Sequence, residues 1–347
     1  MAVGPMLPVL CSLLMLAASQ TEDRPKPKAP PEGYRLHRTI PLPGNEGWDY
    51  VTLDSEARRL YVTRGDRVVV LDLAREKVIG EIPGTGVHGV ALARELKRGF
   101  ASAGGSDSVT LFDLDKLTVL GQVPVGKGPD AILYDPFSRR VFVFGGESKS
   151  ATAIEAADGK LAGAVDLAGK PEFGVSDGKG TIYVNIGDTN EVVAFGSRDL
   201  EVRSRWPLAP CERPTGLAID RARGRLFVGC RSQRLAVLDT AGGKVLATLP
   251  IGRGVDGVAF DAMRGLAFAS TGDGALTVVR EDAPGHFVVV ENATTLPGAR
   301  TLALDPRTHR IYLPTAAFGP PPKATPEDPR PRGPMVPGSF VILVVGK

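Results

Sequence analysis

A phrase of about 42 residues recurs along the chain, and it constrains the fold more than any other feature of the sequence. Its first copy, WDYVTLDSEARRLYVTRGDRVVVLDL at 48–73, contains three short apolar runs separated by small polar turns. Three strands of that length cannot close a core of their own. About six further copies follow, so each copy can bury its apolar faces against its neighbours.

Each copy divides into the same four short runs. The runs are rich in β-branched and aromatic residues, with Gly, Asp and Asn between them, and no segment keeps a helical period. Repeats of this length with four strands are typical of propeller blades. The sequence therefore predicts an all-β fold, a WD40-like, seven-bladed β-propeller with four-stranded blades.

The two ends of the chain complement each other. The seventh copy stops at Lys347 without a fourth strand, and the segment YRLHRTIPLPG at 34–44 resembles an orphan fourth strand such as KVLATLPIG at 244–252. We expect the N-terminal strand to complete the last blade and close the ring, because closure shields the sheet edges that would otherwise invite aggregation.

Several runs resemble a known repeat. LYVT at 60–63 and IYVN at 182–185, followed by VVVLDL at 68–73 and EVVAF at 191–195, look like the YVTN-repeat, YncE-like β-propellers. The resemblance covers nearly the whole chain after the first 33 residues. It implies a protein secreted to the periplasm, in a family with which DNA binding has been associated, and it implies no particular site residues.

The N-terminal segment has the features of a targeting signal. The apolar stretch 6–18 is too short for a membrane span of about 20 residues and is followed by small residues. We expect a signal peptide at 1–20, a Pro-rich linker at 21–33 and one propeller domain at 34–347. The expected product is periplasmic or secreted and monomeric, without a membrane span. Its net charge of +3 is too small to indicate a polyanion partner.

Two cysteines remain beyond the signal segment. Cys211 precedes the first strand of the fifth copy and Cys230 ends its second strand, so adjacent antiparallel strands bring them to the same edge. Oxidising compartments permit a disulfide, which would stabilise the fold by about 3 kcal/mol. The alternative is two separate small apolar side chains.

Six copies carry an acid at the close of the first strand, and Ala93 takes that place in the second copy. Five residues before this position, each copy places one residue where the first strand enters the axial channel. These seven residues are Asp49, His88, Asp130, Glu172, Thr215, Asp256 and Arg300. We expect them to form a ligand-binding ring around one channel mouth, although polar residues are also normal in a water-filled channel without a ligand.

The chemistry of this ring leaves several functions open. Four neighbouring carboxylates repel one another and favour a bound cation, so Asp49, Asp130, Glu172 and Asp256 are candidate ligands of a divalent metal ion. The leading expectation is a binding protein for a small ligand, a metal or a protein partner, rather than an enzyme. The alternative is a metal-assisted, lactonase-like hydrolase or lyase, with His88 as general base and Arg300 as an anion clamp.

Two other features bear on function. The seventh copy carries a Pro-rich insertion at 316–338 between its second and third strands, which we expect to cover the channel mouth. Basic residues gather in the turns of the opposite rim, as in ARELKRG and DPRTHR. They allow a second alternative, nucleic-acid binding, but no stacking aromatic residues accompany them.

Overall fold

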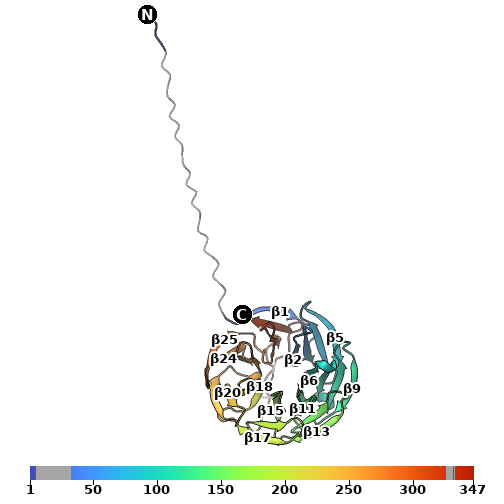
Figure 1. Cartoon of the computed structure of the whole chain (residues 1–347). Coiled ribbons are helices and arrows are strands. Elements are labelled where there is room, and N and C mark those ends of the chain that lie inside the picture. The colour runs from blue at the N-terminus through green and yellow to red at the C-terminus, as the bar shows by residue number, and fades with distance from the viewer. Residues whose placement is uncertain (5–32, 326–330, 332) are drawn as a thin grey trace. The chain divides into compact units, whose positions relative to one another are not determined.

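The structure is a computed structural model that describes residues 1–4, 33–325, 331 and 333–347. Almost all of the expected signal peptide and linker lies outside these residues. Residues 33–347 form one compact unit in which seven four-stranded antiparallel sheets are arranged as a ring (Figure 1). The predicted seven-bladed β-propeller is confirmed. No helix in the described part of the chain is long and apolar enough to cross a membrane.

The first and second strands of the blades lie nearest the axis. The first strands are β2 (Trp48–Asp54), β6 (Val87–Ala93), β10 (Pro129–Asp135), β14 (Pro171–Ser176), β18 (Pro214–Asp220), β22 (Val255–Asp261) and β26 (Ala303–Leu304). The second strands are β3 (Arg59–Arg64), β7 (Arg98–Ala103), β11 (Arg140–Gly145), β15 (Thr181–Ile186), β19 (Arg225–Cys230), β23 (Leu266–Thr271) and β27 (Ile311–Thr315).

The third and fourth strands continue each blade outward. The third strands are β4 (Arg67–Asp72), β8 (Ser108–Asp113), β12 (Ser150–Glu155), β16 (Glu191–Gly196), β20 (Arg234–Asp239), β24 (Ala275–Ala283) and β28 (Val341–Gly346). The fourth strands are β5 (Lys77–Pro83), β9 (Val119–Pro124), β13 (Leu161–Asp166), β17 (Val202–Pro207), β21 (Val245–Pro250), β25 (His286–Thr294) and β1 (Arg35–Pro41). Two single 3-10 turns, η1 (Arg94–Leu96) and η2 (Gly104–Ser106), flank β7.

Burial follows this radial order. The middle strands are buried on both faces, as in β3, where every residue after Arg59 is buried. The outer strands are mostly exposed, as in β5, where Ile82 is the one buried residue. The continuous apolar runs in the sequence therefore correspond to strands packed between two neighbouring blades, which is where most of the core lies.

The N-terminal strand closes the ring, as the sequence predicts. β1 pairs antiparallel with β28, with Ile40 opposite Ile342, so the first and last strands of the propeller share one blade (Figure 1). Ile40 is 1% exposed and packs into a cluster that joins the last blade to the first. Closure is therefore both a backbone pairing and an apolar contact.

The repeated acid has a structural role. Five of the six expected aspartates are buried and accept hydrogen bonds from the turn that follows their strand, namely Asp54, Asp135, Asp220, Asp261 and Asp305. Four of them also form an ion pair or hydrogen bond with a side chain of the next blade, where the partners are Arg94, Ser176, His309 and Ser55. The exception is Asp177, which lies outside β14 and bonds its own turn. The acid thus joins neighbouring blades.

The expected disulfide between Cys211 and Cys230 is present. Its Cα atoms lie 5.7 Å apart, and both residues are fully buried in the core between the fourth and fifth blades. The bond ties the loop that enters β18 to the end of β19.

Candidate functional site

The predicted site residues share one structural position. In six blades the pairing of the first and second strands shifts at the start of the first strand. The register there skips the predicted residue and the residue after it, except in the sixth blade, where it skips Asp256 alone. The predicted residues are Asp49, His88, Asp130, Glu172, Thr215 and Asp256. A β-bulge leaves its extra residue unpaired and re-aims its side chain. Repetition of the bulge therefore explains why polar residues occur at a fixed offset in the sequence.

Polar residues on the second strands hold these bulges in place. Ser102 donates to the carbonyl of Asp130 in the next blade at 2.5 Å, and Ser270 donates to the carbonyl of Arg300 at the same distance. Asn185 donates to the carbonyl of Thr215 at 3.0 Å. In these three blades the fourth residue of the YVTN-like phrase thus fixes the backbone of the site residue in the next blade, while its own side chain is buried.

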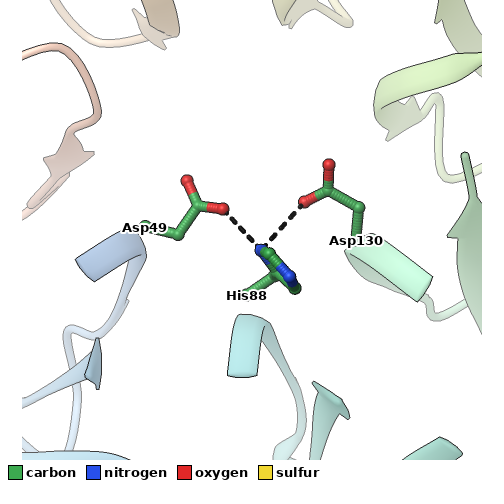
Figure 2. A group of neighbouring side chains, drawn as sticks. All are labelled: Asp49, His88 and Asp130. Atoms are coloured by element: carbon green, nitrogen blue, oxygen red, sulfur yellow. Dashed lines mark hydrogen bonds and ion pairs between the residues drawn. The ribbon is translucent and has the colours of Figure 1, made fainter. Parts of the chain in front are cut away.

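Three of the seven predicted residues form a tight group from the first three blades. His88 Nδ1 lies 2.8 Å from Asp49 Oδ2 and 3.7 Å from Asp130 Oδ1, and the three side chains point toward one another (Figure 2). One potential ligand atom from each residue can be chosen so that all three lie within 4.8 Å of one another. We call Asp49, His88 and Asp130 the Asp–His–Asp group.

Arg300 and Asp256 form a second pair beside this group. Arg300 Nε donates to Asp256 Oδ2 at 2.7 Å, and its Nη2 lies 4.0 Å from Asp49 Oδ1. Glu172 accepts a hydrogen bond from Lys170 at 3.0 Å. Glu172 and Asp256 are thus each paired with a cation from the protein, and neither belongs to the Asp–His–Asp group that could hold a metal.

Thr215 differs from the sequence expectation. Its side chain is 2% exposed, and its hydroxyl donates to the carbonyl of Val255 at 2.9 Å. The hydroxyl thus links the fifth blade to the sixth and is not available to a ligand. A small residue at the bulge can turn inward and satisfy a neighbouring carbonyl, which the longer acidic side chains do not do here.

The electrostatics of the Asp–His–Asp group are unusual. Burial, reinforced by the charge of Asp49, raises the pKa of Asp130 to about 7, although His88 opposes the shift. The hydrogen bond to Asp49 raises the pKa of His88 against the effect of burial. Asp130 Oδ1 is itself buried and has no hydrogen-bond partner among the described residues. Asp130 therefore holds a buried carboxyl oxygen that accepts no hydrogen bond, and its ion-pair contact is His88 Nδ1 at 3.7 Å.

A small cavity lies on the axis below this group. Its volume is about 60 Å³, and every blade contributes to its lining. The lining includes Tyr50, Gly89, Ile132, Phe173, Gly216, Gly257 and Leu302. Tyr50 packs against Phe173 with ring centroids 5.3 Å apart. Burial, together with the surrounding carboxylates, raises the pKa of Tyr50 well above its usual value.

Tyr50 follows Asp49 in the sequence and is not among the seven predicted site residues. The other copies place Gly89, Ala131, Phe173, Gly216, Gly257 and Thr301 at this position. Tyr50 is thus the only phenol among these equivalents, and that contrast is the signal that could have identified it.

The described part of the insertion lies on the expected rim. Phe318 pairs with Met335 and packs against Trp48, with ring centroids 5.9 Å apart. Trp48 precedes Asp49, so this contact places the insertion beside the channel mouth. Within the described residues, none of those that line the axial cavity comes from the insertion. Whether it covers the mouth involves residues 326–330 and 332, which lie outside the described part.

The basic turns of the opposite rim are largely paired with acids. Arg58 forms an ion pair with buried Asp305, Arg94 with Asp54 and Glu56, and Lys97 with Asp115 at 2.8 Å. These pairs offset much of the positive charge that the turns carry. A phosphate backbone would have to compete with these internal carboxylates.

The comparisons with known proteins support the architecture. The β-propeller domain of Myceliophteria thermophila Cps50 (Swd1) has a TM-score of 0.69 at 13% identity, covering 91% of this chain and 100% of that one. U3-55K has a TM-score of 0.71 at 8% identity, covering 88% and 97%. No family model matches the chain, and no curated protein matches it.

The fold and the ring of bulges define the class of protein. The chain is a seven-bladed β-propeller. At these levels of identity, the structural likenesses show the fold alone and carry no activity to this chain.

Proposed function

We propose that the protein is a metal-binding propeller whose channel mouth holds one divalent cation at Asp49, His88 and Asp130. The observation that carries the proposal is the convergence of three potential ligand atoms within 4.8 Å of one another. The buried Oδ1 of Asp130, which accepts no hydrogen bond, supports it, because a cation there would offset the cost of burying that carboxylate.

The donor set indicates the kind of metal. One imidazole and two carboxylates suit first-row transition ions such as Mn²⁺ or Zn²⁺ better than Ca²⁺, which prefers oxygen ligands alone. Three protein ligands would leave coordination positions for water or a further ligand. A proton competes with the metal for His88 Nδ1, so affinity should fall as the pH is lowered.

Isothermal titration calorimetry tests the proposal. We expect one Mn²⁺ or Zn²⁺ to bind per chain, and Asp130→Ala to weaken binding by more than about 100-fold, because loss of a mere supporting contact already costs about 10–100-fold. Asp115→Ala is the control, since Asp115 is exposed on the opposite rim and pairs with Lys97. Equal affinity in the two variants, or no saturable binding by the parent protein, would refute the proposed site.

A second candidate function is metal-assisted hydrolysis or lyase chemistry at the same mouth. The observation in its favour is the pKa of Asp130, about 7, because an acid–base catalyst works best near the operating pH. In this scheme the carboxylates alone would hold the metal, His88 would be the general base and not a metal ligand, and Arg300 would bind a substrate anion. Turnover of a panel of lactones and esters by the metal-loaded protein, lost in His88→Ala, would favour the enzyme over the binding protein.

The finer assignments are also proposals. The runs LYVT and IYVN support membership of the YVTN-repeat, YncE-like group, and the apolar segment 6–18 supports a periplasmic or secreted protein. Cell fractionation with detection of the processed chain tests the location. The ion-paired turns of the opposite rim make nucleic-acid binding the weaker alternative.

A further inference from the structure

A large groove lies next to the channel mouth, between the sixth and seventh blades. Its volume is about 830 Å³, within the usual range for small-molecule sites. Its lining residues come from the sixth and seventh blades, the start of the first blade and the insertion. They are Trp48, Leu296, Pro297, Ala316, Ala317 and Phe318, with Arg300 and several Gly, Thr, Ser and Val residues. Most of this lining is apolar.

The aromatic wall of the groove joins it to the Asp–His–Asp group. Trp48 lines the groove and is followed by Asp49. Its ring packs against Phe318 of the insertion and against Phe340, with centroids 5.9 Å and 5.1 Å away. These contacts hold the indole in place as one wall, so the groove is a built surface and not an incidental gap between loops.

Among the described residues that line the groove, Arg300 is the only charged one. Two of the lining hydroxyls are already committed, since Thr315 donates to Pro297 and Ser339 donates to Val336. Among the described residues, the Arg300 guanidinium makes a hydrogen bond only through Nε, to Asp256. Its two terminal nitrogens therefore keep N–H groups that a ligand can reach, in the planar arrangement that suits a carboxylate.

We propose that this groove binds a small organic anion, with its carboxylate on Arg300 and its apolar body against Trp48, Leu296 and Phe318. Charge complementarity favours an anion because Arg300, a cation, is the one charged side chain among the described residues that line the groove. Outside the Arg300–Asp256 pair, Asp49 Oδ1 lies 4.0 Å from Arg300 Nη2, beyond hydrogen-bonding distance. The apolar lining supplies most of the affinity, and Arg300 selects the head group.

This inference goes beyond the metal proposal and does not depend on it. The residues that line the groove do not include Asp49, His88 or Asp130. A metal-free protein should therefore still bind the anion. A metal at the mouth would lie beside Arg300 and would strengthen binding only for an anion long enough to reach both.

Two probes that share an apolar body but differ in the charge of the head group test whether the groove prefers an anion. We suggest 4-phenylbutyrate and 4-phenylbutylamine, titrated into protein that has been freed of metal by a chelator. The chain has two tryptophans, so a Trp206→Phe background leaves Trp48 as the only indole reporter. We expect saturable quenching or enhancement by the butyrate, with an affinity at least about tenfold higher than that of the amine, and calorimetry should confirm the ratio.

Three variants locate the site. Arg300→Gln should weaken butyrate binding at least about tenfold, whereas Arg213→Gln, on the same rim but outside the groove, should leave it within about twofold. Ala317→Trp should fill the groove and abolish binding, which keeps the test decisive if Arg300→Gln fails to fold. Asp130→Ala should lose metal but retain butyrate, so the two proposals can fail separately.

Each other outcome would overturn the inference. Equal or tighter binding of the amine would refute the anion head group and favour a cation beside the carboxylates. Binding that survives Ala317→Trp would place the probe elsewhere. Absence of saturable binding of both probes would show that the groove is not a site for ligands of this class.

Discussion

A chain that begins at Asn45 is expected to lose the cooperative stability of a chain that begins at Gly33. The deletion removes β1, leaves the edge of β28 without its partner and strips Ile40 and Leu42 from the core. Burial of two such side chains is worth about 5 kcal/mol, and the exposed strand edge favours aggregation. Urea unfolding and size-exclusion chromatography measure the two effects.

A point substitution in β1 tests the same contact if the shortened chain cannot be purified. Ile40→Ala should lower the free energy of unfolding by about 2–5 kcal/mol, as for other fully buried aliphatic residues. Leu36→Ala in the same strand is the control, because Leu36 is 37% exposed. A chain starting at Asn45 that stays monomeric with an unchanged urea midpoint would contradict closure by β1.

Asp305→Ala is expected to lower the free energy of unfolding by about 2–3 kcal/mol, because it removes a fully buried carboxylate that pairs with the partly exposed Arg58. The side chain also accepts from Ser55 at 2.5 Å and from Thr308 at 2.7 Å. Since Ser55 and Arg58 belong to the first blade, the variant breaks the polar contact across the ring closure. Urea unfolding at neutral pH gives the measurement.

The ionisation of Asp305 should make the free energy of unfolding depend on pH. Burial works against ionisation, but hydrogen bonds from Ser55, Thr308 and Arg58 lower the pKa of Asp305 to about 2. A depressed pKa contributes stability above the unfolded value, near 4, and that contribution is lost as the pH falls toward 2. The loss is worth about 2 kcal/mol from this group and should be absent from Asp305→Ala.

Asp177 provides a matched control for these experiments. It occupies the equivalent position in the fourth copy but is partly exposed and bonds only its own turn. Asp177→Ala should cost about 1 kcal/mol, because the two turn hydrogen bonds that it loses can be replaced by bonds to water. Equal losses for the two variants would show that contact with the next blade is not what makes the repeated acid important.

Much of this fold can be predicted from the sequence because each blade repeats one local solution. The channel residue lies at a fixed distance in sequence from the acid that ends the first strand, because a β-bulge occurs at the same place in each of these strands. Asp49 and Asp130 are examples. The offset does not report which way a side chain turns. Thr215 is short enough to bond Val255 inside the sheet, so a residue expected at the mouth is buried.

Other features depend on contacts between distant blades. The raised pKa of Asp130 results from burial and from the charge of Asp49, which lies two blades away in the chain. The groove depends on how Phe318 of the insertion packs against Trp48. The repeat specifies neither the approach of Asp49 to Asp130 nor the packing of Phe318 against Trp48. The sequence therefore predicts polar residues around the channel mouth, but it does not predict that they divide into an Asp–His–Asp group and an apolar groove.

Anomalous X-ray diffraction from crystals grown with Mn²⁺ would show whether the channel mouth holds a divalent cation. The account predicts one strong anomalous peak within bonding distance of Asp49, His88 and Asp130, absent from Asp130→Ala crystals prepared in the same way. A mouth without a peak in the parent protein, or a peak bonded to other residues and unchanged in the variant, would contradict it.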